Sequence, residues 1–342
     1  MRPAKKIIYW VLGIAAVLAV CILILGRGGP AKKPYVLGAT FRYMYAQSLG
    51  LNWKQTYLDM FNDFHVTHVR IPVYWDAIEN SQGKYDFSDL DYEVQQAQAH
   101  KADFILAIGR RVPGWPECHV PVWANTITEQ QRQQALMDEM KQVVLRYKDN
   151  PNLTYWQVEN EPFLTTFGLC PNYSVGADLD SEIAMVRKLD SNHKILVTDG
   201  GEFSVWVDAA RRGDIFGSTF YKKVYTDFFH RYITYHLPPI FYRFKEGVIH
   251  LFWPGKQIIN IELQAEPWTT QGIADTSFKD QAITFPPGQM TENLQLAHES
   301  GFSVTYFWGV EYWYWAAQHG HPEFLNEAKQ LFKENNNANT GN

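Results

Sequence analysis

Two short acidic segments are the strongest chemical signal in the sequence. Residues 156–162 read Trp-Gln-Val-Glu-Asn-Glu-Pro, and residues 258–268 read Ile-Ile-Asn-Ile-Glu-Leu-Gln-Ala-Glu-Pro-Trp. Each is a short apolar run that reaches a glutamate and then a proline, which is typical of a buried strand that delivers a carboxylate at its end. Two such strands in one parallel sheet would bring two glutamates face to face, the arrangement that cleavage of a glycosidic bond requires.

Short apolar runs alternate with longer amphipathic stretches from Tyr35 onward, and this alternation predicts the scaffold. The expected strands are Val36–Phe41, His68–Val73, Phe104–Gly109, Thr154–Glu159, Ile195–Thr198, Ile215–Phe220, Ile258–Glu262 and Ser303–Phe307. The expected helices include Trp53–Phe64, Ser88–His100, Thr128–Tyr147, Ser181–Leu189, Thr291–Glu299 and Glu323–Lys333. This pattern predicts an α/β fold, the (β/α)8 TIM barrel. A doubly wound sheet is the alternative, but no Gly-rich phosphate loop follows the first strand.

The barrel gives the acidic segments a common place, because catalytic residues of this fold lie at the C-terminal ends of its strands. Glu161 would close the fourth strand and Glu262 the seventh. Glu266 follows four residues later and is expected to contact substrate or loop backbone. Glu159 lies one layer deeper than Glu161, where a structural partnership with Arg70 would suit it.

The N-terminus is separate from the barrel. Basic residues precede an apolar run from Ile7 to Leu25, and a Gly-rich break follows. At about 1.5 Å per residue the run comes close to the roughly 30 Å of a bilayer's hydrocarbon core. We therefore expect residues 1–33 to form a cytoplasmic stub, a single transmembrane anchor and a linker, residues 34–334 the barrel, and the Asn-rich residues 335–342 a disordered tail. A cleaved signal peptide, giving a secreted enzyme, is the alternative, although no Ala-x-Ala-like site follows Leu25.

The composition and the cysteines limit the classes of binding partner that the protein could have. A net charge of -5 with 20% charged residues argues against nucleic acid as the main partner. The 12 Trp and 19 Tyr residues either line a cleft for sugar rings or fill the core. Cys118 and Cys170 both follow expected strands that would be neighbours, so they form a disulfide outside the cytoplasm or stay free thiols. No metal is expected at Cys118 and His119, because no second ligand pair has zinc-like spacing.

Several motifs in strand order resemble those of one large superfamily. They are Asn160-Glu161-Pro162, the run His68-Val69-Arg70-Ile71-Pro72 with Tyr74-Trp75, Glu79 and residues 83–87 after it, and Trp308 after the eighth strand. Together they resemble the retaining β-glycosidases of clan A, including their cellulase-like and β-galactosidase-like families. The resemblance covers nearly the whole body, from Val36 to Trp315.

The resemblance implies a role for each matching residue. Glu161 would be the acid/base and Glu262 the nucleophile. Arg70 and Tyr221 would hold Glu262 ionised and oriented, with a plain barrel salt bridge as the alternative for Arg70. Asn160 would bind the sugar 2-hydroxyl, and Trp308 would form an aromatic platform.

Further residues of the barrel mouth would shape the sugar subsites. Trp115 and His119 lie in the loop after the third strand. The aromatic and basic stretch from Tyr221 to Lys256 predicts a helix after Pro239, which would pack as a barrel helix or rest on a membrane. The sequence thus predicts a cofactor-free retaining glycoside hydrolase for an equatorially linked oligo- or polysaccharide. A transglycosylase and a catalytically silent carbohydrate-binding protein are the rivals.

Overall fold

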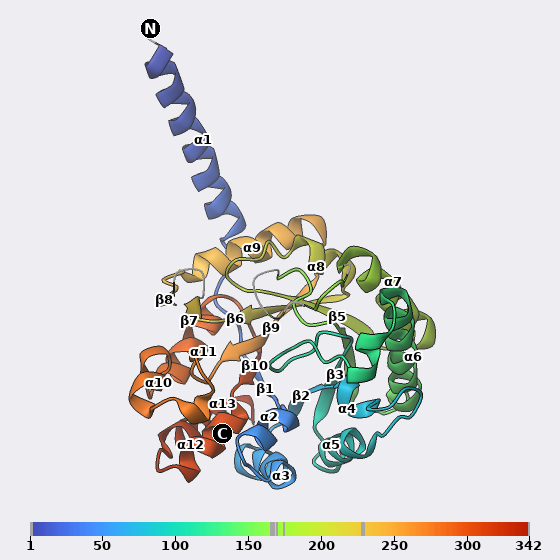
Figure 1. The fold of residues 1–342 in the computed structure, drawn as a ribbon. Helices are drawn as coiled ribbons and strands as arrows, with labels where there is room; N and C mark the ends of the chain where they lie inside the picture. The colour runs from blue at the N-terminus through green and yellow to red at the C-terminus, as the bar shows by residue number, and fades with distance from the viewer. Residues whose placement is uncertain (1–2, 165–167, 169, 174, 227–229, 341–342) are drawn as a thin grey trace.

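A closed barrel of parallel strands forms the body of the protein. The computed structural model describes residues 3–164, 168, 170–173, 175–226 and 230–340. Within them the barrel order is β1-β10-β9-β6-β5-β4-β3-β2, and Figure 1 shows helices arranged around these strands. The strands are β1 (Val36–Thr40), β2 (His68–Pro72), β3 (Asp103–Ile108), β4 (Leu153–Val158), β5 (Lys194–Asp199), β6 (Ile215–Phe220), β9 (Gln257–Gln264) and β10 (Val304–Trp308). The predicted (β/α)8 barrel is confirmed.

The strands are buried on both faces, because helices cover the outside while side chains fill the inside. Ile105, Leu196, Ile215 and Ile259 belong to one small interior cluster. Their chain neighbours, such as Phe104 and Leu106, belong to the larger core under the helices. This alternation by two residues decides which side chains point into the barrel.

The larger helices cover the predicted amphipathic stretches. They are α3 (Trp53–Phe64), α5 (Ser88–Ala99), α6 (Glu129–Tyr147), α7 (Val175–Leu189), α9 (Pro239–Phe252), α11 (Gln289–Glu299) and α13 (Glu323–Thr340). Of these, α7 begins six residues earlier and α13 ends seven residues later than predicted. At the start of α6 the Thr128 hydroxyl accepts from the Gln131 N–H while the Gln131 side chain accepts from the Thr128 N–H, a capping box. In α9, Tyr242 and Ile249 are buried, which favours the packed barrel helix over one that lies on a membrane.

The sequence pattern did not predict several shorter elements. They are α2 (Tyr43–Ser48), α4 (Trp75–Ile78), α8 (Val207–Arg212), α10 (Phe278–Thr284), α12 (Val310–Gln318), the 3-10 turns η1 (Val122–Thr126) and η2 (Ile273–Asp275), and the antiparallel pair β7 (Lys223–Thr226) and β8 (Arg231–Thr234). Most are too short to show a helical or strand period.

The N-terminal helix α1 (Pro3–Leu25) points away from the barrel and meets it beside α9 (Figure 1). Its last residue lies so close to Gly247 of α9 that a Cβ there would collide with the Leu25 carbonyl oxygen. In the part of the chain that the structure describes, no helix is both long and apolar enough to cross a membrane. The predicted membrane span is therefore not supported.

The C-terminal segment also differs from the prediction. Residues 335–340, expected to be disordered, continue α13 as helix. This helix packs against α3 and β1, and the Asn339 side chain donates to the Tyr35 carbonyl at 2.6 Å. An Asn-rich composition is a weak helix former, but contacts with the barrel outweigh that local preference here.

Candidate active site

Arg70 is the centre of the polar network inside the barrel. It lies in β2 and is completely buried. Its Nε donates to Gln157 Oε1 at 2.7 Å, its Nη1 to Glu262 Oε1 at 2.6 Å, and its Nη2 to Asn160 Oδ1 at 2.7 Å. One guanidinium thus connects strand β2 to β9 and to the end of β4, which suits the planar fork of arginine.

Glu262 receives a donor on each carboxylate oxygen. Arg70 binds Oε1, and the hydroxyl of Tyr221, the residue after β6, donates to Oε2 at 2.9 Å. Both partners predicted from the sequence are therefore in contact with Glu262. Two donors, one of them cationic, fix the orientation of this carboxylate.

A bulge in β9 aims Glu262 into the barrel. The β6–β9 register pairs Ser218 with Asn260 but Thr219 with Glu262, so β9 contains one extra residue at this point. Ile259 belongs to the interior cluster, and strict alternation would send a residue three positions later outward. The extra residue reverses that parity. Glu262 consequently lies within β9, not at its end as predicted.

Glu161 is held by a turn that follows β4. The strand ends at Val158, three positions before the glutamate, so Glu161 does not close the strand as predicted. Its φ is 42°, in the left-handed region. Its N–H donates to Thr198 Oγ1 at 2.8 Å, and its Oε1 accepts from Thr219 Oγ1 at 3.0 Å. Because side chains two apart share a strand face, Thr219 and Tyr221 approach the two glutamates from the same side of the chain.

The surroundings of the two carboxyls differ electrostatically. Burial raises the pKa of Glu161 well above its ordinary value, and the negative charges of Glu262 and Glu117 raise it further, against the opposing effect of Arg111. The Thr219 hydroxyl that donates to Glu161 is neutral, whereas Glu262 accepts from the Arg70 guanidinium. These surroundings favour the protonated form of Glu161.

Glu159 has a different partner from the one predicted. Its oxygens accept from the backbone N–H groups of Arg110 and Arg111 at 2.6 and 2.7 Å, whereas the Arg70 guanidinium donates to Gln157, Asn160 and Glu262. Gly109 makes this possible: its φ is 132°, and a Cβ there would collide with the Glu159 carboxylate. Glu159 therefore ties the loop after β3 to the end of β4.

Glu266 is bound by an arginine that the sequence pattern did not reveal. Arg42, two residues after β1, donates to its two oxygens at 3.0 and 2.8 Å and to Glu311 of α12 at 2.7 Å. The same guanidinium lies 4.0 Å from the centre of the Trp308 ring. Trp308 is thus mostly buried with Arg42 against its face, which differs from an open platform.

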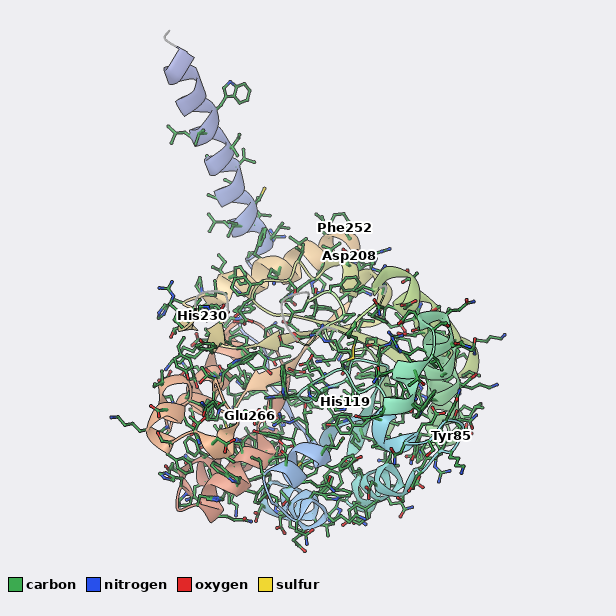
Figure 2. The ribbon with its side chains drawn as sticks, viewed as in Figure 1. Tyr85, His119, Asp208, His230, Phe252 and Glu266 are labelled. Carbon is green, nitrogen blue, oxygen red and sulfur yellow. A yellow bond between two sulfur atoms is a disulfide. The ribbon has the colours of Figure 1, made fainter. Side chains whose placement is uncertain are left out.

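The remaining predicted residues lie in the loop after β3. Trp115 is 72% exposed, as a subsite residue could be. His119 is buried, with its ring nitrogens near Asp76 and the Gly114 carbonyl at 3.3 and 3.2 Å. Figure 2 shows His119 and Glu266 within the body of the barrel domain. None of the contacts described for His119 reaches Glu161 or Glu262. Next to it, Cys118 forms a disulfide with Cys170.

Four contributors were missed by the sequence argument. They are Arg42, Thr198, Thr219 and Glu311. Thr219 could have been found, because it precedes Tyr221 by two and must share its face. Arg42 and Glu311 come together only through closure of the barrel between its first and last strands, so no local pattern indicates them.

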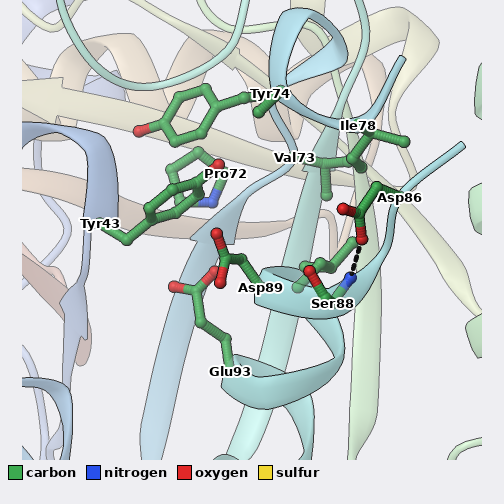
Figure 3. A pocket seen from close by; sticks show the side chains of 11 residues that line it. Tyr43, Pro72, Val73, Tyr74, Ile78, Asp86, Ser88, Asp89 and Glu93 are labelled. Atoms are coloured by element: carbon green, nitrogen blue, oxygen red, sulfur yellow. Dashed lines mark hydrogen bonds between the residues drawn. The ribbon is translucent and has the colours of Figure 1, made fainter. Parts of the chain in front are cut away.

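A small acidic cavity of about 60 Å³ lies beside the end of β2, apart from the glutamate pair. Figure 3 shows Tyr43, Asp89 and Glu93 among its lining residues. Both Glu93 oxygens are fully buried without a hydrogen-bond partner among the described residues. Burial raises the Glu93 pKa well above its ordinary value, so this group is held as a neutral acid.

The closed barrel brings together Glu161, in the turn after its fourth strand, and Glu262, within its seventh. Residues 38–237, more than half of the chain, match the family model of cellulase (glycosyl hydrolase family 5). The chain therefore belongs to this family of enzymes that hydrolyse O-glycosyl compounds. The match includes Glu161 and ends before Glu262.

Other similarities concern β-galactosidases. The β-galactosidase LacA of Lactobacillus acidophilus is 31% identical over 104 residues, which cover 25% of this chain and 16% of that protein. The solved β-galactosidase from Bacillus circulans sp. alkalophilus has a TM-score of 0.58 at 12% identity, covering 91% of this chain and 57% of that one. A β-galactosidase from Halorubrum lacusprofundi has a TM-score of 0.55 at 13% identity, over 80% and 52%. The chain thus spans well under two thirds of these relatives, and the structural likeness shows the fold alone.

Proposed function

We propose that this protein is a retaining glycosidase with Glu262 as nucleophile and Glu161 as acid/base. The observation that carries the proposal is the unequal treatment of two buried carboxyls. Glu262 accepts from Arg70 and Tyr221, which orient its carboxylate, while burial and neighbouring negative charges raise the pKa of Glu161. A double displacement needs an oriented nucleophile and a protonated acid.

The reaction then follows from the two positions. Glu262 attacks the anomeric carbon while Glu161 gives its proton to the leaving glycosidic oxygen, and a covalent glycosyl-enzyme forms. Glu161, now ionised, takes a proton from water as the water displaces Glu262. Asn160 supports the assignment of a sugar contact: its Oδ1 accepts from Arg70, while its buried Nδ2 lacks a partner among the described residues and is free to donate to a sugar hydroxyl.

The substrate class proposed is an equatorially linked oligo- or polysaccharide. The β-galactosidases among the similar proteins support a β-linked sugar. The exposed Trp115 provides a ring face of the kind that stacks on sugars.

Azide rescue of a nucleophile variant tests the mechanism. Glu262→Gly should abolish release of the aglycone from aryl β-glycosides, and added azide should restore it with a glycosyl azide of inverted configuration. Glu266→Gly is the matched control, since Glu266 is also a buried glutamate of the same segment and pairs with Arg42. If azide rescues a Glu266 variant instead, the nucleophile is misassigned.

The same assay separates the rival functions. A transglycosylase would release aglycone faster when an acceptor sugar is added, whereas a hydrolase would not. A silent carbohydrate-binding protein would release none. Turnover of the unmodified protein without an acceptor is the result expected for the hydrolase.

We also propose that the barrel works outside the cytoplasm. The Cys118–Cys170 disulfide supports this, because such bonds persist mainly in oxidising compartments. Maleimide labelling of denatured protein from thiol-blocked cells should leave both cysteines unlabelled unless a reductant is added first. Labelling without reductant would contradict the proposal.

A further inference from the structure

Glu117 is a third buried carboxylate beside the glutamate pair. It lies in the loop after β3 and is 5% exposed. Its Oε2 accepts from Arg111 Nε at 2.8 Å in an ion pair that is almost fully enclosed. The mechanism described above gives neither residue a role.

Arg111 connects this carboxylate to the turn that carries Glu161. Its Nη1 donates to the Glu161 carbonyl at 2.9 Å and to the Leu164 carbonyl at 3.0 Å. Both contacts are to backbone, so they fix the path of the chain rather than the acid group. Glu161 has a positive φ, a conformation that a non-glycine residue keeps only when its surroundings hold it.

Glu117 is itself fixed from both sides. Its carbonyl accepts from the Val112 N–H at 2.9 Å, and its N–H donates to the Gly114 carbonyl. The next residue, Cys118, is bonded to Cys170 in the loop that follows Glu161. Gly168 of that loop lies so close that a Cβ there would come within 2.6 Å of Glu117 Oε2.

The charges around Glu161 come from three elements. Glu262 faces it from β9, Glu117 and Arg111 from the loop after β3, and Asp199 from the end of β5. Glu117 and Arg111 form an ion pair, and exchanging the Glu117 carboxylate for an amide would remove one negative charge from the surroundings of Glu161. That loss lowers the pKa of Glu161.

We propose that Glu117 is a positioning residue for the acid/base: through Arg111 it fixes the turn that carries Glu161, and the Cys118–Cys170 bond holds it in place. The inference rests on the proposed role of Glu161. It predicts that Glu117 matters for protonation of the leaving group and much less for attack by Glu262.

Leaving-group dependence measures that distinction. We would compare kcat/KM of Glu117→Gln on two aryl β-glycosides of the same sugar, one with an acidic phenol that departs without a proton and one with a weakly acidic phenol that needs it. For the glycoside of the weakly acidic phenol, kcat/KM should fall about tenfold or more, which is within the range of general acid catalysis. For the glycoside of the acidic phenol, kcat/KM should fall about twofold or less.

The pH profile gives an independent readout. The basic limb of kcat/KM reports the pKa of the essential acid in the free enzyme. Loss of the Glu117 charge lowers the pKa of Glu161, so the basic limb should move to lower pH by about half a unit to one unit. Reduction of the disulfide, or the Cys118→Ser/Cys170→Ser pair, should lower activity on the weakly acidic phenol in the same selective way.

The matched control is Glu129→Gln. Glu129 pairs with Arg110, the neighbour of Arg111, at 2.7 Å and lies at the start of α6. In this variant, kcat/KM on both glycosides and the position of the basic limb should be the same as in the unmodified enzyme. Equal losses on both phenols in Glu117→Gln, or an unmoved basic limb, would overturn the inference. Glu161→Gln must show the same leaving-group selectivity; if it does not, the proposed role of Glu161 fails first.

Discussion

Replacing Arg70 by lysine tests the polar network at its centre. Lysine keeps the positive charge but offers one compact ammonium in place of a planar fork. The guanidinium satisfies Gln157, Asn160 and Glu262 at once, each at 2.6–2.7 Å and out of contact with solvent. A single Nζ cannot reach three acceptors that the fork meets from three nitrogens.

The size of the effect follows from those contacts. If the ammonium keeps Glu262, the amide oxygens of Gln157 and Asn160 lose a buried donor, and each such loss costs about 1–3 kcal/mol. We expect Arg70→Lys to lower the free energy of unfolding by about 2–4 kcal/mol, since the losses are not additive. Glu262 and Asn160 also lose their fixed positions, so kcat/KM should fall by about a hundredfold, equivalent to roughly 2.7 kcal/mol of transition-state stabilisation.

Urea denaturation and aryl glycoside hydrolysis, measured on the same preparation below the unfolding transition, separate the two effects. A folded variant with activity within about threefold of the unmodified enzyme would refute the reasoning, because it would make Arg70 a plain structural salt bridge. Gln157→Leu is a useful partner variant, since it removes one acceptor of the fork without touching either glutamate.

Three further changes have expected outcomes. Glu93→Gln should stabilise the protein by about 1–3 kcal/mol near pH 7. The pKa of Glu93 is raised in the folded protein, so the unmodified protein loses stability as the pH rises above about 4.5, the pKa of this group in the unfolded chain. Thermal melting should show that the gain vanishes toward pH 4, and a gain that does not depend on pH would contradict this reasoning. Arg42→Met leaves the carboxylates of Glu266 and Glu311 buried without their cation, so the free energy of unfolding measured in urea should fall by about 3–5 kcal/mol. Adding Glu311→Gln should recover part of this loss. If the effects of the two substitutions simply add, the pairing is contradicted. Tyr221→Phe removes the donor to Glu262 Oε2 and should lower kcat about tenfold or more with a small change in melting temperature; unchanged kcat would exclude that contact from the reaction.

The sequence predicted the barrel because strands and helices of this fold differ in period and alternate regularly. The strands His68–Pro72 and Ile215–Phe220 begin where the apolar runs begin. Contacts between segments that are close in the fold but distant in the sequence were harder to predict. Arg42 meets Glu311 only because β1 and β10 close the barrel, and a local pattern carries no trace of that closure.

The periodicity of the sequence also could not predict the exact backbone positions and hydrogen-bond partners of the glutamates. In the run from Ile258 to Gln264 the sequence singles out Glu262 but places that residue at a strand end, whereas β9 continues to Gln264. The structure reaches the same exposure to the barrel interior by a bulge within β9, which a single extra apolar residue does not announce. Glu159 was expected beside Arg70 because it lies two positions before Glu161, one layer deeper in the barrel, but backbone N–H groups satisfy its carboxylate instead.

The two glutamates have different backbone settings, which suit the different roles proposed for them. Glu262 lies at a bulge within β9, where Arg70 of β2 and Tyr221, the residue after the neighbouring strand β6, each donate to one of its oxygens. Glu161 lies beyond its strand in a turn, where the backbone takes most of the hydrogen bonds: its N–H donates to Thr198 and its carbonyl accepts from Arg111. The acid group is left with the Thr219 hydroxyl and negative neighbours, which favours its protonated form. In the proposed mechanism, the loop after β3 therefore holds the turn through the backbone and leaves the Glu161 carboxyl to give up its proton.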